Sequence, residues 1–410
     1  MISKHLGSGY ELLAQRQFRD LWITNLVSSF GSVMLLLAAS WIMTSMTRNA
    51  VLVALVQTSV SLPFFFLSIP AGILNDLYGY RKLLLIAHVA MMVPTALLGL
   101  LAWRGLLSPW LLLLLLLMIG VGTVIHQSSW KTLLQDLVPT EQSMAAVSLN
   151  SLSNKIGQAA GPMIGGFLVE VAAGVWVFAT RVASHIIMIL LLRRIPKPLV
   201  PEARDPFSLV NLMGFFGEGW RFLCGSSAIR GPLIRCALFM APCAGMLALL
   251  PLEARENIQT GVIGYGGLLA ALGVGTSLGS GLMPMLHRNF RTGPLTTVAL
   301  AVFSVSVLGV SQWDSMLLDA SFLLAGGFSW SILTVSHQVS VQLSSPDMLR
   351  GRLTSFYLLT LQGSMALGSL VFGWIAATCG VSRSIMLCGF VAMAGLLLVK
   401  KYPLTTGQSG

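Results

Sequence analysis

Of the ionisable side chains inside long apolar stretches of this sequence, six are the candidates for a functional role. A charge in such surroundings is costly, so the group is usually kept to bind a charged molecule, carry a proton or form an ion pair. None of the six belongs to a motif for covalent chemistry, so binding and proton transfer are their expected chemistry. The six are Lys155, Arg181, His185, His126, His337 and Asp319.

Three of these groups are basic and form the predicted substrate site. Lys155 is near the middle of an apolar run, and Arg181 and His185 are one helical turn apart on one face. A central ammonium exposed to lipid would cost several kcal/mol, so we expect Lys155 to face water, a substrate or an acid. The alternatives are a structural ion pair for Lys155 and, for Arg181, a side chain that extends to the outer membrane interface.

The other three are the predicted proton carriers. Asp319 is a carboxyl group within the apolar run 315–338, and His337 lies toward the end of the same run. His126 lies toward the end of the apolar run 109–130. Histidine changes its charge near physiological pH, which suits a carrier of protons. The alternatives are interfacial hydrogen bonding for the histidines and a solvated position near the surface for Asp319.

The sequence lacks the motifs of the common enzyme classes. It has no glycine-rich phosphate loop followed by Lys and Ser or Thr, no G-x-S-x-G elbow, no H-E-x-x-H and no Cys/His cluster with metal-ligand spacing. We therefore expect no enzyme, no cofactor and no metal. Energy is expected from an ion gradient, with protons favoured, rather than from ATP.

The composition places the chain in a membrane. Of its 410 residues 55% are hydrophobic and 10% are charged, whereas a soluble domain is about 25% charged. The net charge of +11 comes from basic residues between apolar runs, which fits membrane topology better than binding to nucleic acid.

Twelve stretches are long and apolar enough to cross a bilayer, which takes about 20 residues each. Six precede and six follow a proline-rich polar break. We therefore expect an all-α membrane protein of two pseudo-symmetric six-helix bundles, 1–192 and 231–410, with a cytoplasmic linker, 193–230, that contains an interfacial helix over 207–223. The expected spans are 21–46, 50–71, 83–103, 109–130, 142–169, 174–192, 232–252, 261–284, 294–311, 315–338, 353–378 and 382–399.

Lysine and arginine orient these spans. Most of them fall at one set of helix ends, and the opposite ends carry only Arg48, Arg104, Arg255 and Arg383. Because basic loops stay in the cytoplasm, both termini are expected there, in a bacterial-type inner membrane. We expect a monomer.

The two halves also share short patterns. His-Gln at 126–127 recurs at 337–338, and Gly161 of the fifth span corresponds to Gly368 of the eleventh. Repeated six-span halves suggest alternating access around a midplane site.

The fifth span carries glycines four residues apart. Gly157, Gly161 and Gly165 share one helix face, and Pro162 bends the helix there. A face without side chains lets another helix come close. The stretch is therefore either a hinge for transport or a static packing seam.

The first inner loop holds the other candidate gating residues. Gly72 and Gly79 permit a tight turn, Asp76 can cap a helix of another span, and Arg81 follows it. The alternative is an ordinary basic inner loop with one incidental acid.

These stretches resemble signatures of the major facilitator superfamily. Residues 72–82 are similar to its G-x-L-x-D-R-x-G-R-K motif, and residues 157–166 to its G-x-x-x-G-P-x-x-G-G antiporter motif. The segments 249–252 and 345–352 resemble the branch with the enterobactin exporter and macrolide-type efflux pumps.

The resemblance implies roles for the loop residues. Asp76 would hold one conformation through contacts with span eleven and the loop between spans four and five. Arg81 would pair with an acid in that loop, for which Asp136 is the candidate. Leu77 and Tyr80 stand where the family usually has Arg, so only part of its charge relay is expected.

We therefore expect a secondary transporter that exports small amphipathic organic molecules, with the cargo, protons and the lipid bilayer as partners. The antiporter-like stretch favours export. Interior cations outnumber acids, which favours an anionic or oxygen-rich cargo such as a siderophore. The alternatives are broad multidrug efflux and a non-transporting or lipid-handling membrane protein.

Overall fold

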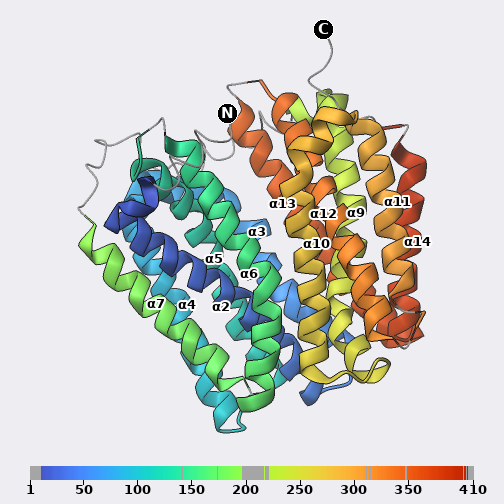
Figure 1. Cartoon of the computed structure of the whole chain (residues 1–410), viewed down its shortest axis with the longest axis horizontal. Coiled ribbons are helices and arrows are strands. Elements are labelled where there is room, and N and C mark those ends of the chain that lie inside the picture. Colours follow the sequence, from blue (N-terminus) through green and yellow to red (C-terminus); the bar gives the residue numbers. More distant parts are fainter. Residues whose placement is uncertain are drawn as a thin grey trace. The chain divides into compact units, whose positions relative to one another are not determined.

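The computed structural model describes residues 11–139, 142–172, 174–195, 217, 221–310, 312–313, 315–346, 349–399, 401–402 and 404. The predicted twelve-helix fold is confirmed, since each expected span overlaps one long helix of this part of the chain (Figure 1). The helices are α2 (Arg16–Met46), α3 (Ala50–Tyr78), α4 (Tyr80–Trp103), α5 (Pro109–Asp136), α6 (Ser143–Ala172), α7 (Val175–Arg194), α9 (Ser227–Glu256), α10 (Gly261–Asn289), α11 (Thr292–Gly309), α12 (Met316–Leu343), α13 (Arg350–Cys379) and α14 (Val381–Val399).

Eleven of these helices are long and apolar enough to cross a membrane, as judged on the described residues. The exception is α6, whose first half carries Asn150, Asn154, Lys155 and Gln158. A helix of 30 residues is about 45 Å long, more than a bilayer core needs. We therefore infer that α6 also spans the bilayer, with Asn150 and Asn154 hydrogen-bonded to side chains of α2.

Contacts divide the chain into two compact units. The first comprises Met1–Ala39 and Phe66–Pro206, and the second comprises Ser40–Phe65 and Phe207–Gly410. The second unit thus takes the last turns of α2 and the first half of α3. Packing in one conformation does not test which helices move together, so the division into halves at 192 and 231 stays a prediction.

Glycine brings helix backbones together in the second unit, where α10 lies beside α12 and α13 beside α9 (Figure 1). A methyl group on Gly275 would collide with the backbone oxygen of Leu324, and one on Gly368 with that of Ala241. These contacts allow the closely packed seams that helices form in lipid.

The glycine face of α6 packs against α2 in the same manner. A Cβ on Gly157 would lie 3.0 Å from the Cβ of Ser29, and a Cβ on Gly165 would lie 3.1 Å from the Cα of Met34. The predicted close approach of another helix at this face is therefore present, and Pro162 lies within α6.

The connection between α3 and α4 differs in part from the prediction. Gly79 alone separates the helices, with φ 75°, a conformation that other residues avoid. Gly72, predicted to form the same turn, instead lies within α3, because the helix continues two turns beyond its apolar segment. The side chain of Asp76 lies outside the described part of the structure, as does most of the expected interfacial helix at 207–223.

Candidate functional site

A polar cavity of about 400 Å³ lies within the first unit. α2 lines it with Asn25, Ser28, Ser29 and Ser32, which share one helix face because they are spaced three and four residues apart. This stripe lies within the membrane-spanning part of the helix. Its position explains why so many small polar groups can be retained in a membrane-spanning segment.

α6 lines the opposite wall with Asn150, Asn154 and Gln158, again one turn apart. The amide of Asn25 donates to Oδ1 of Asn150 over 3.1 Å, and the hydroxyl of Ser29 donates to Oδ1 of Asn154 over 2.8 Å. These bonds between side chains fix the width of the cavity. They add to the contact that the glycine face makes further along the same two helices.

Arg181 of α7 also lines this cavity, and its side chain passes close to α2. Its side chain is 4% exposed, and its Nη1 donates to the backbone oxygen and to the hydroxyl of Ser28, both over 2.6 Å. Its Nε has no hydrogen-bond partner among the described residues. The side chain crosses α2 at Gly31, where a Cβ would lie 2.8 Å from its Cδ. Arg181 therefore points into the protein and does not extend to the membrane interface.

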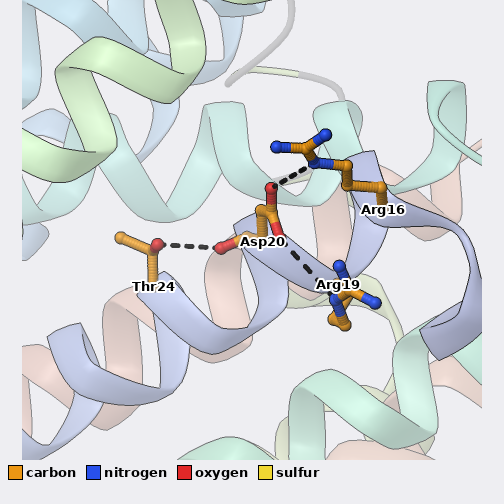
Figure 2. A network of polar contacts seen from close by, with 4 residues as sticks. All are labelled: Arg16, Arg19, Asp20 and Thr24. Atoms are coloured by element: carbon orange, nitrogen blue, oxygen red, sulfur yellow. Dashed lines mark hydrogen bonds and ion pairs between the residues drawn. The ribbon is translucent and has the colours of Figure 1, made fainter.

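No carboxylate neutralises Arg181 within the described part of the chain. The carboxylate of Asp20 pairs instead with Arg16 and Arg19 at the exposed start of α2 (Figure 2). The cavity lining includes one other charge, Lys131, and no acid. Because a buried cation without a counter-ion is unfavourable, the site favours an anion or a cluster of oxygen acceptors.

Three histidines lie beside Arg181. Nδ1 of His88 and Nδ1 of His185 are 2.9 Å apart and share a hydrogen bond, and both side chains are fully buried. The ring of His126, which lines the cavity, lies edge-on to His88 with centroids 5.0 Å apart and stacks on Trp130. In the described residues no three His, Cys, Asp or Glu are arranged to hold a metal ion.

The profile of a family described as transmembrane secretion effector matches residues 7–409. The chain is a member of the major facilitator superfamily. Enterobactin exporters EntS are similar over 389 residues: that of Escherichia coli O1:K1 / APEC is 25% identical, covering 93% of this chain and 89% of the exporter. The protein from Citrobacter koseri is 24% identical, covering 93% and 91%.

Solved transporters share the fold. The nucleoside transporter NupG superposes with a TM-score of 0.75 at 12% identity and covers 96% of this chain and all of its own. A bacterial homologue of the human lysosomal transporter Spinster, inward-facing and unoccupied, gives 0.73 at 14% identity, covering 96% and 98%. The protein is thus a multi-pass membrane transporter and not an enzyme.

The transporter brings together only some of the predicted binding residues. Arg181 and His185 are both buried on α7, where Arg181 contacts α2 and His185 contacts α4. Lys155 is half-buried on α6 and is not among the residues that line the cavity, although its neighbour Asn154 is. The structure therefore favours Arg181 over Lys155 as the cation that faces the cavity.

The other predicted proton carriers are in the second unit. Asp319 lies in the first turn of α12 and is fully buried, which rules out the solvated alternative. His337 is 1% exposed, and neither ring nitrogen has a hydrogen-bond partner in the described part of the chain. Of the predicted carriers, His126 alone lines the cavity of the first unit.

The loop cation has partners other than the predicted one. Arg81 donates to the backbone oxygens of Leu192 and Arg193, over 2.9 and 2.8 Å, and so caps the end of α7. Asp136 instead lies within hydrogen-bonding reach of Tyr80. Tyr80 stands at a position where the superfamily usually has Arg, so a neutral hydroxyl replaces a charge next to this acid.

Several site residues were missed in the sequence. His88 stands alone in the apolar run of α4, and Ser28 belongs to the polar stripe of α2. The sequence shows how these residues are spaced within a single helix, but it does not show which other helix they face. Arg235 was counted among the cytoplasmic charges, yet it is 5% exposed within α9 and donates to Thr296 of α11.

Proposed function

We propose that this transporter exports small anionic or oxygen-rich organic molecules, with siderophores as the leading class, by alternating access. The cavity beside Arg181 is the proposed cargo site, and the electrochemical ion gradient is the proposed energy source. The observation that carries the proposal is a buried arginine, with no hydrogen-bond partner for its Nε among the described residues, at a polar cavity that has no acid in its lining.

The energetics favour such a cargo. A hydrogen bond from a charged donor to an oxygen acceptor contributes about 1.5–3 kcal/mol. Nη1 of Arg181 is held by Ser28, so the guanidinium is already oriented before cargo enters, and less side-chain entropy is lost on binding. The amides and hydroxyls of α2 and α6 supply further partners for oxygen-rich molecules.

Export as the direction has two supports. The relatives named above are exporters by name, and the stretch 157–166 of α6 has the antiporter-like pattern. Pro162 lies within α6 next to the α2 seam, and a proline inside a helix gives it a place at which to bend. Asp76, Gly79, Arg81 and Asp136 are the proposed gating residues at the inner ends.

The remaining predictions are kept as proposals. The chain lies in the inner membrane of a bacterial-type cell as a monomer, with both termini in the cytoplasm. Asp319 and His337 are proton-site candidates in the second unit.

Transport into inverted membrane vesicles tests the function. Vesicles with the full chain and an imposed gradient should accumulate enterobactin, and Arg181→Gln should lower the initial rate about tenfold or more, which corresponds to about 1.4 kcal/mol. Lys155→Gln is the matched control, since it removes a cation from α6 outside the cavity lining, and it should retain most of the rate.

Broad multidrug efflux and the non-transporting alternative give different results. Broad efflux predicts equal loss of enterobactin and of the cationic dye ethidium in Arg181→Gln. Absence of gradient-dependent flux for both compounds in the wild-type protein would favour a scaffold or lipid-handling role.

A further inference from the structure

The histidine pair beside the cavity has the geometry of a one-proton site. The bond between His88 and His185 joins Nδ1 to Nδ1, so one ring must donate its proton and the other must accept it. In the neutral pair, the donor ring therefore has a bare Nε2 and the acceptor ring has a protonated Nε2.

This arrangement can take up one proton without breaking. The added proton binds to the bare Nε2, the donor ring becomes an imidazolium, and its Nδ1–H still donates to the other ring. The bond between the rings becomes charge-assisted, which strengthens it. A second proton would occupy the remaining Nδ1 and abolish the bond, so the pair holds one.

A route to the cavity exists through the third ring. His126 lines the cavity and lies against His88, and its Nδ1 is buried without a hydrogen-bond partner in the described part of the chain. Nε2 of His88 and of His185 are likewise buried and unpartnered there. The three rings therefore form a contiguous path from the cavity into the helix bundle.

The charges that face the pair decide when it fills. They are His126 of α5 and Arg181 of α7, while Lys131 of α5 lines the same cavity. Within the described residues no carboxylate faces the pair. Arg181 repels an incoming proton as long as it is itself unneutralised, and an anion in the cavity removes this repulsion.

We propose that His88 and His185 form a proton-binding site that fills when an anion binds beside Arg181, so that anion and proton occupy the first unit together. The inference rests on the proposed anionic cargo. Linkage requires the effect to be reciprocal, so the proton also tightens binding of the anion.

Calorimetry on the purified full chain in detergent tests the linkage without transport. Salicylate is the anionic probe and salicylamide is its uncharged counterpart. Titrations at about pH 6.5, close to the usual range of histidine, are repeated in buffers of different ionisation enthalpy, whose slope gives the protons taken up. We expect about one proton per salicylate bound and none with salicylamide.

Asparagine variants separate proton binding from structure. The amide of Asn lies close to the position of Nδ1, so the double variant His88→Asn/His185→Asn can keep a hydrogen bond between α4 and α7 but has neither imidazole to hold the proton. This double variant should abolish proton uptake, and salicylate should bind it several-fold more weakly at about pH 6.5 with less pH dependence. His287→Asn, in α10 of the second unit, is the control and should behave as wild type.

The outcomes distinguish this inference from the proposed function. Salicylate binding without proton uptake, or uptake that persists in the double Asn variant, would overturn the inference while leaving anion export intact. Failure of the wild-type protein to bind salicylate would also overturn it. Failure of the proposed function would instead appear as absent flux in the vesicle assay.

Discussion

At the scale of single residues, the support of Arg181 matters as much as its charge. Its Nη1 contacts both the backbone oxygen and the hydroxyl of Ser28. The backbone oxygen alone would let the guanidinium rotate, so the hydroxyl acts as the second point that orients it.

Ser28→Ala should therefore weaken cargo binding while leaving the fold intact. Removing one acceptor costs about 1.5–3 kcal/mol at most when the donor is charged, and we expect KM for enterobactin to rise about 3- to 10-fold with kcat little changed. Initial rates in inverted vesicles measure this. Ser151→Ala is the control, because that exposed hydroxyl bonds within its own helix. An unchanged KM in Ser28→Ala would contradict the orienting role.

The contrast between Arg181 and Lys155 shows what a single sequence can predict at this scale. Each is a cation in an apolar run, and the cost of such a charge can be inferred from the sequence alone, whichever helix packs against it. The direction in which a side chain points depends on how helices rotate against one another, which one helix does not specify. For the same reason His88 was overlooked, because its importance comes from His185, 97 positions away.

At the scale of helices, the seam between α6 and α2 gives an ordered prediction. A Cβ on Gly157 would lie 3.1 Å from the backbone carbon of Ser29, and one on Gly165 would lie 3.0 Å from Cγ of Met34, whereas the nearest atom to a Cβ on Gly161 is 3.4 Å away. The last distance is an ordinary van der Waals contact. The seam is therefore tight at its ends and looser in its middle.

Gly157→Ala and Gly165→Ala should each lower the melting temperature of the purified protein and slow transport, and Gly161→Ala should be close to wild type. Backbone atoms cannot move aside without separating the helices, and overpacking costs about 1–3 kcal/mol. Thermal denaturation in detergent ranks the three variants. Greatest damage from Gly161→Ala would show that the seam does not have this spacing in the membrane.

The turn before α4 allows a matched pair of substitutions. Gly79 has φ 75° and ψ 143°, a region that is nearly exclusive to glycine, whereas Gly72 is helical with open space around it. Gly79→Ala should destabilise the protein by about 1–3 kcal/mol. Gly72→Ala should be neutral or slightly stabilising, because alanine favours the helix by about 1 kcal/mol. Equal effects on melting temperature would refute the difference assigned to the two glycines.

The helices themselves were largely predictable, and their ends were not. Hydropathy marks the part of a helix that lies in lipid, so α5 was expected to end at 130 and α12 at 338, yet they continue to Asp136 and Leu343. Backbone hydrogen bonding goes on into the polar region, where composition no longer marks it. α6 is the converse case, because its polar lining lowers its hydropathy.

At the scale of the whole molecule, similar devices recur in both halves of the sequence. Glycine brings α6 against α2 and α13 against α9, and a glycine with positive φ precedes both α7 and α14. Buried arginines are found in both halves as well, Arg181 and Arg235. The charges nevertheless differ, since the buried acid Asp319 has no equivalent in the cavity lining of the first unit. The two halves therefore share the arrangement of their helices and differ in the charged side chains that could bind cargo or protons.

Alternating access predicts that the cavity opens to each side of the membrane in turn. Ser29 and Asn154 line it from α2 and α6, so Ser29→Cys and Asn154→Cys are suitable reporters once the exposed Cys224 and Cys379 are replaced by Ser. A membrane-impermeant maleimide should label each reporter from either side in separate experiments. Enterobactin should protect both, because it fills the space that the reagent must enter. The transport gradient should shift reactivity toward one side and lower it on the other, since one population of molecules is shared between two states.

Exposed Thr180 of α7 is the control position, because the reactivity of a cysteine placed there should not depend on the gradient. Reporters that react equally from both sides under every condition, or from neither, would contradict a cavity that alternates, and with it the route proposed for the cargo.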